Sequence, residues 1–183
     1  TGYPKGAVIT QRALMANIEQ ISGVLRLRPG DRTLVVAPLF HAGVVPAALV
    51  PVFHASTLII HDRFAAQATV DSLEREEISY VLLVPTMMQA CLSCLGSTDR
   101  PRFPRLRFIY YGASPADEGL LRRALGAFRC GFIQSYGLTE ATQAVTFLTP
   151  ADHERGLAER PSLLRSAGTP APRTELRIVD PEG

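Results

Sequence analysis

The sequence lacks a membrane-length apolar segment, a strong charge bias and an even number of cysteines. Its longest apolar run, residues 42–53, is too short to cross a bilayer and is interrupted by Pro46 and Pro51. The formal net charge of +2 is too small to indicate nucleic acid or an anionic membrane as a partner. Three cysteines cannot form a complete disulfide framework and no secretory signal is visible, so the sequence favours a cytoplasmic protein.

Two common nucleotide-binding patterns are also missing. The G-x-x-x-x-G-K-[ST] spacing of a P-loop is absent. No G-x-G-x-x-G follows the early strands, which disfavours a nicotinamide-binding domain. Cys91 and Cys94 have the C-x-x-C spacing of redox and metal sites, but they lie in an apolar helical stretch without a second pair. We therefore expect two packed core thiols.

What the sequence does contain is an alternation of short apolar runs and helical patterns. The 183 residues, 46% of them hydrophobic, suffice for a single domain, 1–183, with a substantial core. Five strand-like runs recur at intervals of about 25 residues: 33–37, 57–61, 80–84, 107–111 and 131–135. Strands that alternate with helices predict an α/β fold with a mainly parallel sheet flanked by helices. The continuous hydrophobicity of these runs is typical of strands covered on both faces.

Helices are predicted from capping residues and apolar spacing. Thr10 is expected to cap a helix that ends near Pro29 and Gly30. Ser114 is expected to cap a second helix, with Pro115 at its first position. The pattern further predicts helices at 71–77 and 85–95, loops at 96–105 and 149–173, and a last strand at 175–179.

Residues with useful chemistry gather in two glycine turns that follow consecutive strands. Segment 112–115 follows the fourth strand-like run, and segment 136–140 follows the fifth. Strands consecutive in sequence are usually neighbours in the sheet. Because ligands bind at the carboxyl ends of strands in open parallel sheets, we expect the two turns to form one wall of a ligand site.

The residue types in these turns suit a nucleotide. Gly112 and Gly137 would let the backbone approach a flat base closely, and Tyr136 offers a ring on which adenine can stack. Thr139 offers a hydroxyl to phosphate, and Glu140 offers a hard oxygen ligand for Mg²⁺. Each residue also has a plain alternative, because glycines are common in turns and acids are common at helix starts.

A lysine near the amino end has a similar setting. Lys5 is flanked by Gly2, Pro4 and Gly6, which would hold its charge on a stiff loop suited to polyphosphate. Surface turns often have this composition, so the loop alone is weak evidence. Together with segment 136–140 it supplies the cation, hydroxyl and carboxylate needed to hold a nucleoside triphosphate with its magnesium ion.

The order of the motifs carries a more specific indication. Along the chain they read TGYPKG (1–6), PLFH (38–41), VPT (84–86), YGASP (111–115), YGLTE (136–140) and SAGTP (166–170). This series closely resembles the adenylate-forming (AMP-binding) superfamily, and within it the acyl-CoA synthetases. The resemblance covers essentially all 183 residues. It implies part of the large N-terminal domain of such an enzyme, with ATP, Mg²⁺ and coenzyme A as cofactors or co-substrates and a small carboxylic acid as the other substrate.

Matching the motifs residue by residue implies individual roles. Thr1, Gly2 and Lys5 would belong to a phosphate-binding loop. The nucleotide would be bound by Gly112, Ala113, Ser114, Ser135, Tyr136, Gly137, Leu138 and Thr139. Lys5, Thr139 and Glu140 would be catalytic, with Glu140 as the Mg²⁺ ligand. His41 and Gly137 would line the acyl pocket.

His41 helps to separate branches of the superfamily. Amino-acid-activating members usually have Phe-Asp where this chain has Phe40 and His41, and that aspartate pairs with the substrate's ammonium group. A histidine cannot do this well. The resemblance therefore implies a fatty or aryl acid, activated to an acyl-adenylate and then converted to a coenzyme A thioester.

Three alternatives remain open at this point: an adenylation domain that loads a carrier protein, a luciferase-like oxidase, and a non-catalytic nucleotide-binding module. The start of the phosphate loop is not found before Thr1, and the small C-terminal domain of the family would lie beyond Gly183. We therefore expect a fragment that cannot complete either half-reaction alone.

Overall fold

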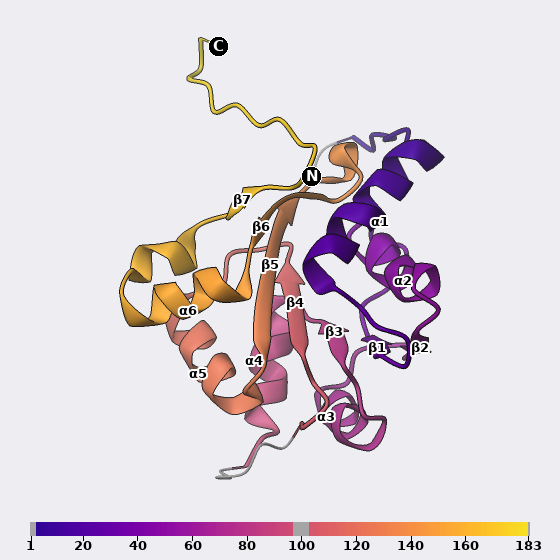
Figure 1. Cartoon of the computed structure of the whole chain (residues 1–183), viewed down its shortest axis with the longest axis vertical. Coiled ribbons are helices and arrows are strands. Elements are labelled where there is room, and N and C mark those ends of the chain that lie inside the picture. Colours follow the sequence, from indigo (N-terminus) through magenta and orange to yellow (C-terminus); the bar gives the residue numbers. More distant parts are fainter. Residues whose placement is uncertain (1–2, 97–102, 183) are drawn as a thin grey trace.

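The computed structural model describes residues 3–96 and 103–182, and within them the chain forms a seven-stranded sheet flanked by helices (Figure 1). The strands are β1 (Arg32–Val35), β2 (Thr57–Ile60), β3 (Tyr80–Leu82), β4 (Phe108–Gly112), β5 (Gly131–Gly137), β6 (Ala144–Leu148) and β7 (Thr169–Pro170). Their order is β2-β1-β3-β4-β5-β6-β7. The first five are parallel, and β6 and β7 are antiparallel. The predicted α/β fold with a mainly parallel sheet is confirmed.

Helices cover both faces of this sheet, as Figure 1 shows. They are α1 (Gln11–Leu25), α2 (Val44–Phe53), α3 (Ala66–Arg75), α4 (Pro85–Ser93), α5 (Glu118–Phe128) and α6 (Pro150–Ala158), with short 3₁₀ turns η1 (Thr139–Ala141) and η2 (Pro161–Arg165). Helices α1 and α2 pack on one face, and α3, α4 and α5 pack on the other. Because side chains alternate along a strand, Tyr110 faces α1 and α2 while Tyr111 faces the opposite layer.

Thr10 caps α1 as predicted, since its side chain accepts a hydrogen bond from the backbone N–H of Ala13. The helix ends earlier than expected, at Leu25, where Arg26 adopts a left-handed conformation (φ 48°). The cap predicted at Ser114 is wrong. Asp117 caps α5 instead and accepts from the N–H of Leu120 at 2.9 Å, so residues 114–116 remain outside the helix.

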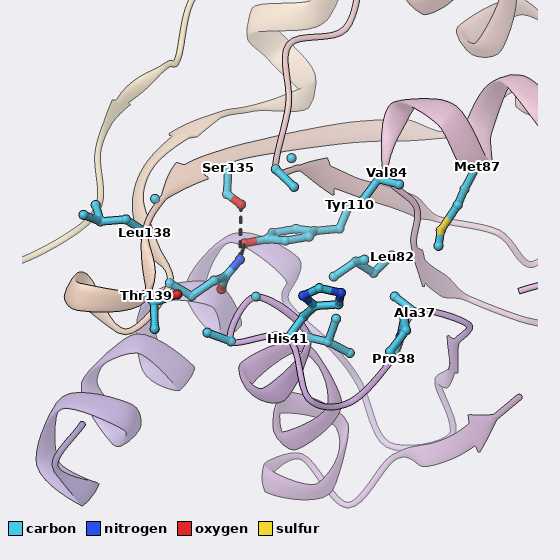
Figure 2. Close-up of a pocket in the computed structure, with 17 residues that line it drawn as sticks. Ala37, Pro38, His41, Leu82, Val84, Met87, Tyr110, Ser135, Leu138 and Thr139 are labelled. Carbon is cyan, nitrogen blue, oxygen red and sulfur yellow. Dashed lines mark hydrogen bonds between the residues drawn. The ribbon is translucent and has the colours of Figure 1, made fainter. Parts of the chain in front are cut away.

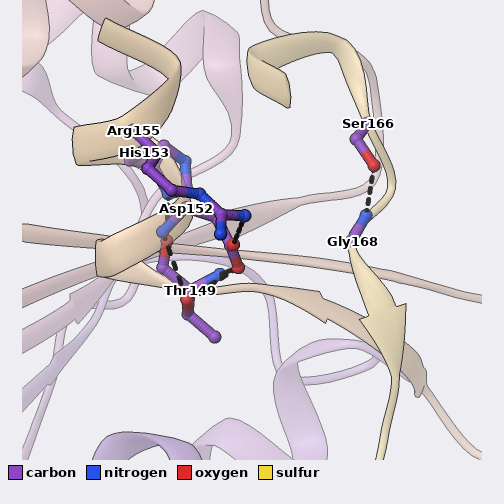
Figure 3. A network of polar contacts seen from close by, with 6 residues as sticks. All are labelled: Thr149, Asp152, His153, Arg155, Ser166 and Gly168. Carbon is purple, nitrogen blue, oxygen red and sulfur yellow. Dashed lines mark hydrogen bonds and ion pairs between the residues drawn. The ribbon is translucent and has the colours of Figure 1, made fainter. Parts of the chain in front are cut away.

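Two helices were not predicted. Residues 44–53 form α2 although they contain two prolines. Pro46 is tolerated because it lies in the first turn, where backbone N–H groups have no partner within the helix, whereas Pro51 lies inside the helix and has no N–H to donate to the carbonyl of Ala47. Segment 149–173, predicted as a loop, contains α6, η2 and β7. Thr149 and Asp152 form a capping box at the start of α6, and this T-x-x-D spacing is a signal that the sequence already contained (Figure 3).

The predictions for the last part of the sheet were incomplete. Strand β6 was missed, and the strand predicted at 175–179 is wrong: these residues form neither strand nor helix. Ile178 is 91% exposed in this segment, so its apolar side chain does not pack against the core as that of a half-buried strand would. The helix predicted at 71–77 begins earlier, at Ala66. The loop predicted at 96–105 lies largely outside the described residues.

A buried histidine joins α6 to the sheet. The side chain of His153 is 0% exposed, and its Nδ1 lies 2.8 Å from the carbonyl oxygen of Thr149 (Figure 3). Since a carbonyl only accepts, Nδ1 carries the proton and Nε2 accepts from the Tyr111 hydroxyl at 2.8 Å. Burial lowers the pKa of His153, although the Thr149 carbonyl and the nearby Asp152 charge act in the opposite direction.

This lowered pKa predicts acid sensitivity. In the unfolded chain a histidine titrates near pH 6.5, so below that pH the unfolded state binds more protons than the folded state. We expect the free energy of unfolding to fall by up to about 1 kcal/mol between pH 7 and pH 5.5 through this residue. Unfolding in denaturant at several pH values measures how the free energy of unfolding changes with pH, and His153→Gln should make this slope smaller. An identical slope in the variant would contradict the prediction.

Candidate active site

The carboxyl ends of the parallel strands meet at one edge of the sheet, and two adjoining cavities open there. Gly112, at the end of β4, is paired with Ser135 in β5. The segment that follows β5 turns through η1 and returns as antiparallel β6. This arrangement brings the two predicted glycine turns together, as the sequence suggested.

The first cavity, called here the His41 cavity, has a volume of about 350 Å³. It is bounded by the segment between β1 and α2, by the ends of β3, β4 and β5, and by the residues leading into η1. Its lining residues are Ala37, Pro38, His41, Ala42, Gly43, Val44, Leu82, Val84, Met87, Tyr110, Gly112, Ala113, Ser135, Gly137, Leu138, Thr139 and Gln143 (Figure 2). The wall is mostly apolar, which is typical of a site for a small organic molecule.

His41 lies at the exposed side of this cavity. Its backbone N–H donates to the carbonyl of Pro38 at 3.1 Å, which forms a tight turn after β1. The centroid of the His41 ring is 4.6 Å from the centroid of the Phe40 ring. In the view of Figure 2 the His41 ring lies near the side chains of Leu82 and Tyr110. The prediction that His41 lies at a pocket is therefore consistent with the geometry, while its role stays a prediction.

A buried polar cluster forms the inner part of the same cavity. The Gln143 Nε2 donates to the Tyr110 hydroxyl at 2.9 Å and lies 3.3 Å from Ser135 Oγ. Burial raises the pKa of Tyr110 to about 12, and hydrogen bonds with Ser135 and Gln143 offset part of this effect. Sequence reasoning missed Tyr110 and Gln143, because the first looks like an ordinary strand residue and the second precedes a strand that was not predicted.

The second cavity, called here the Tyr136 cavity, has a volume of about 290 Å³. Its lining residues are Ala113, Ser114, Pro115, Ala116, Gln134, Ser135, Tyr136, Gly137, Leu164, Arg165 and Ala167. The Tyr136 side chain is 52% exposed, so a face of its ring is available for stacking. Arg165, in η2, adds a cation that sequence reasoning did not identify, because the turn was assigned to a loop.

The two glycines of these turns have a packing role in addition to the role predicted from the sequence. A Cβ at Gly112 would lie 2.5 Å from the carbonyl oxygen of Ser135, and a Cβ at Gly137 would overlap the backbone of Gln143. Both glycines thus permit close approach of neighbouring backbone segments, and their predicted place beside a base stays a prediction. The left-handed position in the turn belongs to Ala113 (φ 67°), a strained conformation for a residue with a side chain.

Thr139 and Glu140 lie side by side in η1, and both are exposed. Thr139 lines the His41 cavity. Within residues 3–96 and 103–182, no group of three or more His, Cys, Asp or Glu side chains could hold a metal ion. A metal at Glu140 would therefore need most of its ligands from a bound molecule or from water.

The remaining predicted residues are placed as follows. Ser114 lines the Tyr136 cavity, and Leu138 lines the His41 cavity. Lys5 is exposed in the segment that precedes α1. This segment lies at the end of the sheet toward which β4 and β5 point (Figure 1). Thr1 and Gly2 lie outside the described residues. A meeting of Lys5 with Glu140 stays a prediction.

In the part of the chain that the structure describes, no helix is long and apolar enough to cross a membrane.

The cysteines are not paired. Cys91, Cys94 and Cys130 are free thiols, and burial raises the pKa of Cys91 to about 12. The expectation of packed thiols rather than a C-x-x-C redox pair agrees with this environment.

A parallel sheet with two cavities at its carboxyl edge defines an α/β ligand-binding domain, and comparison with known proteins identifies its family. The chain belongs to the AMP-binding enzyme family, which it matches over residues 1–183. The predicted membership of the adenylate-forming superfamily is confirmed.

The similar proteins with curated functions include acid–thiol ligases. The chain is 34% identical over 191 residues to indoleacetate–CoA ligase of Aromatoleum aromaticum, covering 100% of this chain and 34% of that protein. It is 35% identical over 190 residues to a fatty acid–[acyl-carrier-protein] ligase of Streptomyces coeruleorubidus, covering 100% of this chain and 35% of that protein. The chain thus spans about a third of the length of these relatives.

Solved structures of coenzyme A ligases have a similar fold. O-succinylbenzoate coenzyme A synthetase of Bacillus subtilis, in complex with ATP and magnesium ion, superposes with a TM-score of 0.84 at 28% identity, over 99% of this chain and 36% of that one. The N-terminal domain of FACL13 from Mycobacterium tuberculosis has a TM-score of 0.80 at 23% identity, over 93% of this chain and 41% of that one. The latter likeness confirms the predicted fold, that of the N-terminal domain in such enzymes.

Proposed function

We propose that the complete protein joins a carboxylic acid, fatty or aryl, to ATP and then passes the acyl group to the thiol of coenzyme A. The main support is that the His41 and Tyr136 cavities meet at Ala113, Ser135 and Gly137. The first cavity suits a carbon skeleton, and the second, with an aromatic face, suits a nucleotide. Two such compartments side by side can hold a carboxylate next to the α-phosphate of ATP.

The proposed reaction has two steps. A carboxylate oxygen of the acid attacks the α-phosphorus of ATP, and the bond from that phosphorus to pyrophosphate breaks. The sulfur of coenzyme A, after losing its proton, then attacks the acyl carbonyl carbon, and AMP leaves with the oxygen. In both steps the protein has to bind, orient and neutralise charge, and no side chain needs to act as a nucleophile.

The residues of the Tyr136 cavity and the glycine turns would bind the nucleotide. Tyr136 stacks on adenine, and the turn from Gly112 to Ser114 lies along its edge. Thr139 donates its hydroxyl to a phosphate oxygen, and Lys5 places its charge on the phosphates. Ser135 and Leu138 complete the wall, with Thr1 and Gly2 in the phosphate-binding loop.

The surroundings of Glu140 fit a magnesium ion that is held largely by phosphate. In nucleotide sites Mg²⁺ keeps several waters and binds through one or two carboxylates plus phosphate oxygens. The exposed carboxylate of Glu140, next to Thr139, provides one such ligand. When bound there, the ion supplies neutralisation of charge on the phosphates.

The acid would lie in the His41 cavity. Its apolar wall accommodates the carbon skeleton, Gly137 borders the reacting end, and His41 lies beside the carbonyl that the thiol attacks. A second candidate function is transfer to a carrier protein, which the similarity to the acyl-carrier-protein ligase favours. For location, the three free cysteines suit a reducing compartment, and we propose the cytoplasm.

Exchange of labelled pyrophosphate into ATP tests the proposal. We expect the complete protein to catalyse exchange with at least one acid from a panel of fatty and aryl carboxylates, and only with Mg²⁺ present. Thioester formation should follow on adding coenzyme A, whereas transfer only to a phosphopantetheinylated carrier would support the second candidate. Absence of exchange with every acid would refute both. Because the chain spans about a third of its relatives, we expect residues 1–183 alone to give no exchange.

A further inference from the structure

A chain of hydrogen-bonding groups links α6 to the Tyr136 cavity through the interior of the protein. The backbone carbonyl oxygen of Thr149 lies 2.8 Å from His153 Nδ1, and His153 Nε2 lies 2.8 Å from the Tyr111 hydroxyl. That hydroxyl is in turn 3.3 Å from Gln134 Oε1. His153 and Tyr111 are both 0% exposed and line neither cavity. Gln134 lines the Tyr136 cavity, so the chain ends at a wall where a ligand can bind.

The protons of this chain are fixed from the α6 end. Because the Thr149 carbonyl can only accept, His153 Nδ1 carries a proton. Burial lowers the pKa of His153, so near pH 7 the ring is neutral and Nε2 is an acceptor. The single proton of the Tyr111 hydroxyl is then donated to Nε2, and burial raises the pKa of Tyr111, so the hydroxyl keeps that proton. The hydroxyl has no second proton to donate to Gln134.

Gln134 therefore has to donate to Tyr111 and cannot accept from it. With Oε1 facing the hydroxyl at 3.3 Å, two acceptors would meet. A half-turn of the amide brings Nε2 to the Tyr111 oxygen, which has a lone pair left to accept. This orientation is favoured, because an unsatisfied contact at a buried hydroxyl is costly. It leaves Oε1 on the side away from Tyr111, free for a ligand in the Tyr136 cavity.

The residue that offers a stacking surface lies on the same side of the strand as this amide. Gln134 and Tyr136 are two positions apart in β5, so their side chains point to the same face, and both line the Tyr136 cavity. A flat base stacked on Tyr136 would therefore meet Gln134 at its edge. An acceptor at this point suits the amino group of a 6-aminopurine. It disfavours a 6-oxopurine, whose oxygen would face Oε1.

We propose that Tyr111 and His153 are positioning residues that fix the Gln134 amide with Oε1 toward the Tyr136 cavity, and that they thereby make this cavity prefer a 6-aminopurine nucleotide to a 6-oxopurine one. The inference rests on the proposed function for the identity of the ligand as a nucleotide. Neither residue touches the ligand, because each acts through the next group in the chain. Since the chain has a direction, removal of its acceptor at His153 should reverse the amide.

Binding of AMP and IMP to the complete protein tests this inference, because the two nucleotides share ribose and phosphate and differ only in the base. Affinities are measured by calorimetry without the acid. We expect the wild type to bind AMP about tenfold or more tightly than IMP, since a buried polar group that loses its partner costs about this much. Tyr111→Phe removes the hydroxyl and frees the amide to turn, so it should lower the AMP/IMP affinity ratio by about fivefold or more.

Tyr80→Phe is the matched control. Tyr80 is also 0% exposed, and its hydroxyl has no hydrogen-bond partner among residues 3–96 and 103–182. It lies in β3 and lines neither cavity. The control should retain the wild-type ratio. A merely structural role for Tyr111 would weaken AMP and IMP equally and leave the ratio unchanged in Tyr111→Phe.

His153→Leu tests the direction of the chain. Without an acceptor at this position, the Tyr111 hydroxyl donates to Gln134 Oε1, and the amide N–H groups turn toward the cavity. IMP should then gain on AMP, with a ratio lower than that of Tyr111→Phe. The Thr149 carbonyl keeps its backbone hydrogen bond from the N–H of residue 153, at 3.1 Å. Should His153→Leu nevertheless fail to fold, the comparison of Tyr111→Phe with Tyr80→Phe decides the question.

The outcomes separate this inference from the proposed function. An equal AMP/IMP ratio in the wild type and in Tyr111→Phe overturns the inference, and pyrophosphate exchange by the same samples then leaves the proposed function standing. A wild type that binds IMP as tightly as AMP also overturns the inference. A preference for AMP that depends on Tyr111, without exchange for any acid, supports the inference and overturns the proposed function. Failure of both nucleotides to bind, together with absence of exchange, overturns both.

Discussion

Replacing Glu140 with glutamine should reduce pyrophosphate exchange by about 10²–10³-fold, which is the usual loss when one electrostatic contact to a reacting group is removed. The substitution keeps the size of the side chain and removes its charge, and Mg²⁺ prefers hard anionic oxygens. Because Glu140 is exposed in η1, the fold should be affected by no more than about 0.5 kcal/mol.

The experiment separates chemistry from stability. Exchange rates are measured over a range of Mg²⁺ concentrations, and we expect the variant to need more Mg²⁺ as well as to have a lower kcat. Glu154→Gln is the matched control, since Glu154 is exposed on α6 and lines neither cavity. Activity of Glu140→Gln within about threefold of the wild type would argue against the proposed metal ligand, because the expected loss is far larger.

Gly137→Ala should have the largest effect on the fold. A Cβ at this position would overlap the backbone of Gln143, so β5 and β6 would have to move apart where their register already shifts. We expect a loss of about 3 kcal/mol in the free energy of unfolding, at the upper end of the usual cost of overpacking. For a chain of this size such a loss corresponds to a fall of about 6–12 °C in Tm.

A second glycine provides the control. Gly126 lies in α5, is exposed, and has nothing within 4 Å of an added Cβ. Gly126→Ala should therefore stabilise the protein by about 0.5–1 kcal/mol, because alanine loses less backbone entropy in a helix. Urea unfolding of both variants gives the comparison. A Gly137→Ala protein as stable as the wild type would show that β5 and β6 can separate at this point without cost.

Much of the fold was predictable because its signals are local. All five parallel strands were expected within a few residues of their observed positions, since their apolar runs are short and bounded by helical patterns. Thr10 was correctly assigned as a helix cap, because a cap bonds to a residue only three positions away. Helix α6 was not predicted although Thr149 and Asp152 have a recognisable capping spacing. The signal was present in the sequence but was not used.

The antiparallel end of the sheet was harder to predict. Segments 144–148 and 175–179 both show the apolar content of a strand, yet only the first becomes one. Strand β6 pairs with β5 and β7, whereas 175–179 has no neighbouring strand among the described residues. A strand requires a partner for its backbone groups, and the local sequence does not specify that partner.

The sequence by itself determined the fold class, the family and the two glycine turns that meet at the carboxyl edge of the sheet, because motif order and hydrophobic periodicity are properties of the chain alone. The tertiary structure decided how closely Gly112 and Gly137 pack against neighbouring backbone and which residues form the inner lining of the His41 cavity. Gln143 meets the Tyr110 hydroxyl across 33 positions of sequence, and neither residue is distinctive in its own segment. Their contact arises because β6 turns back against β5 and carries Gln143 to the face on which Tyr110 lies.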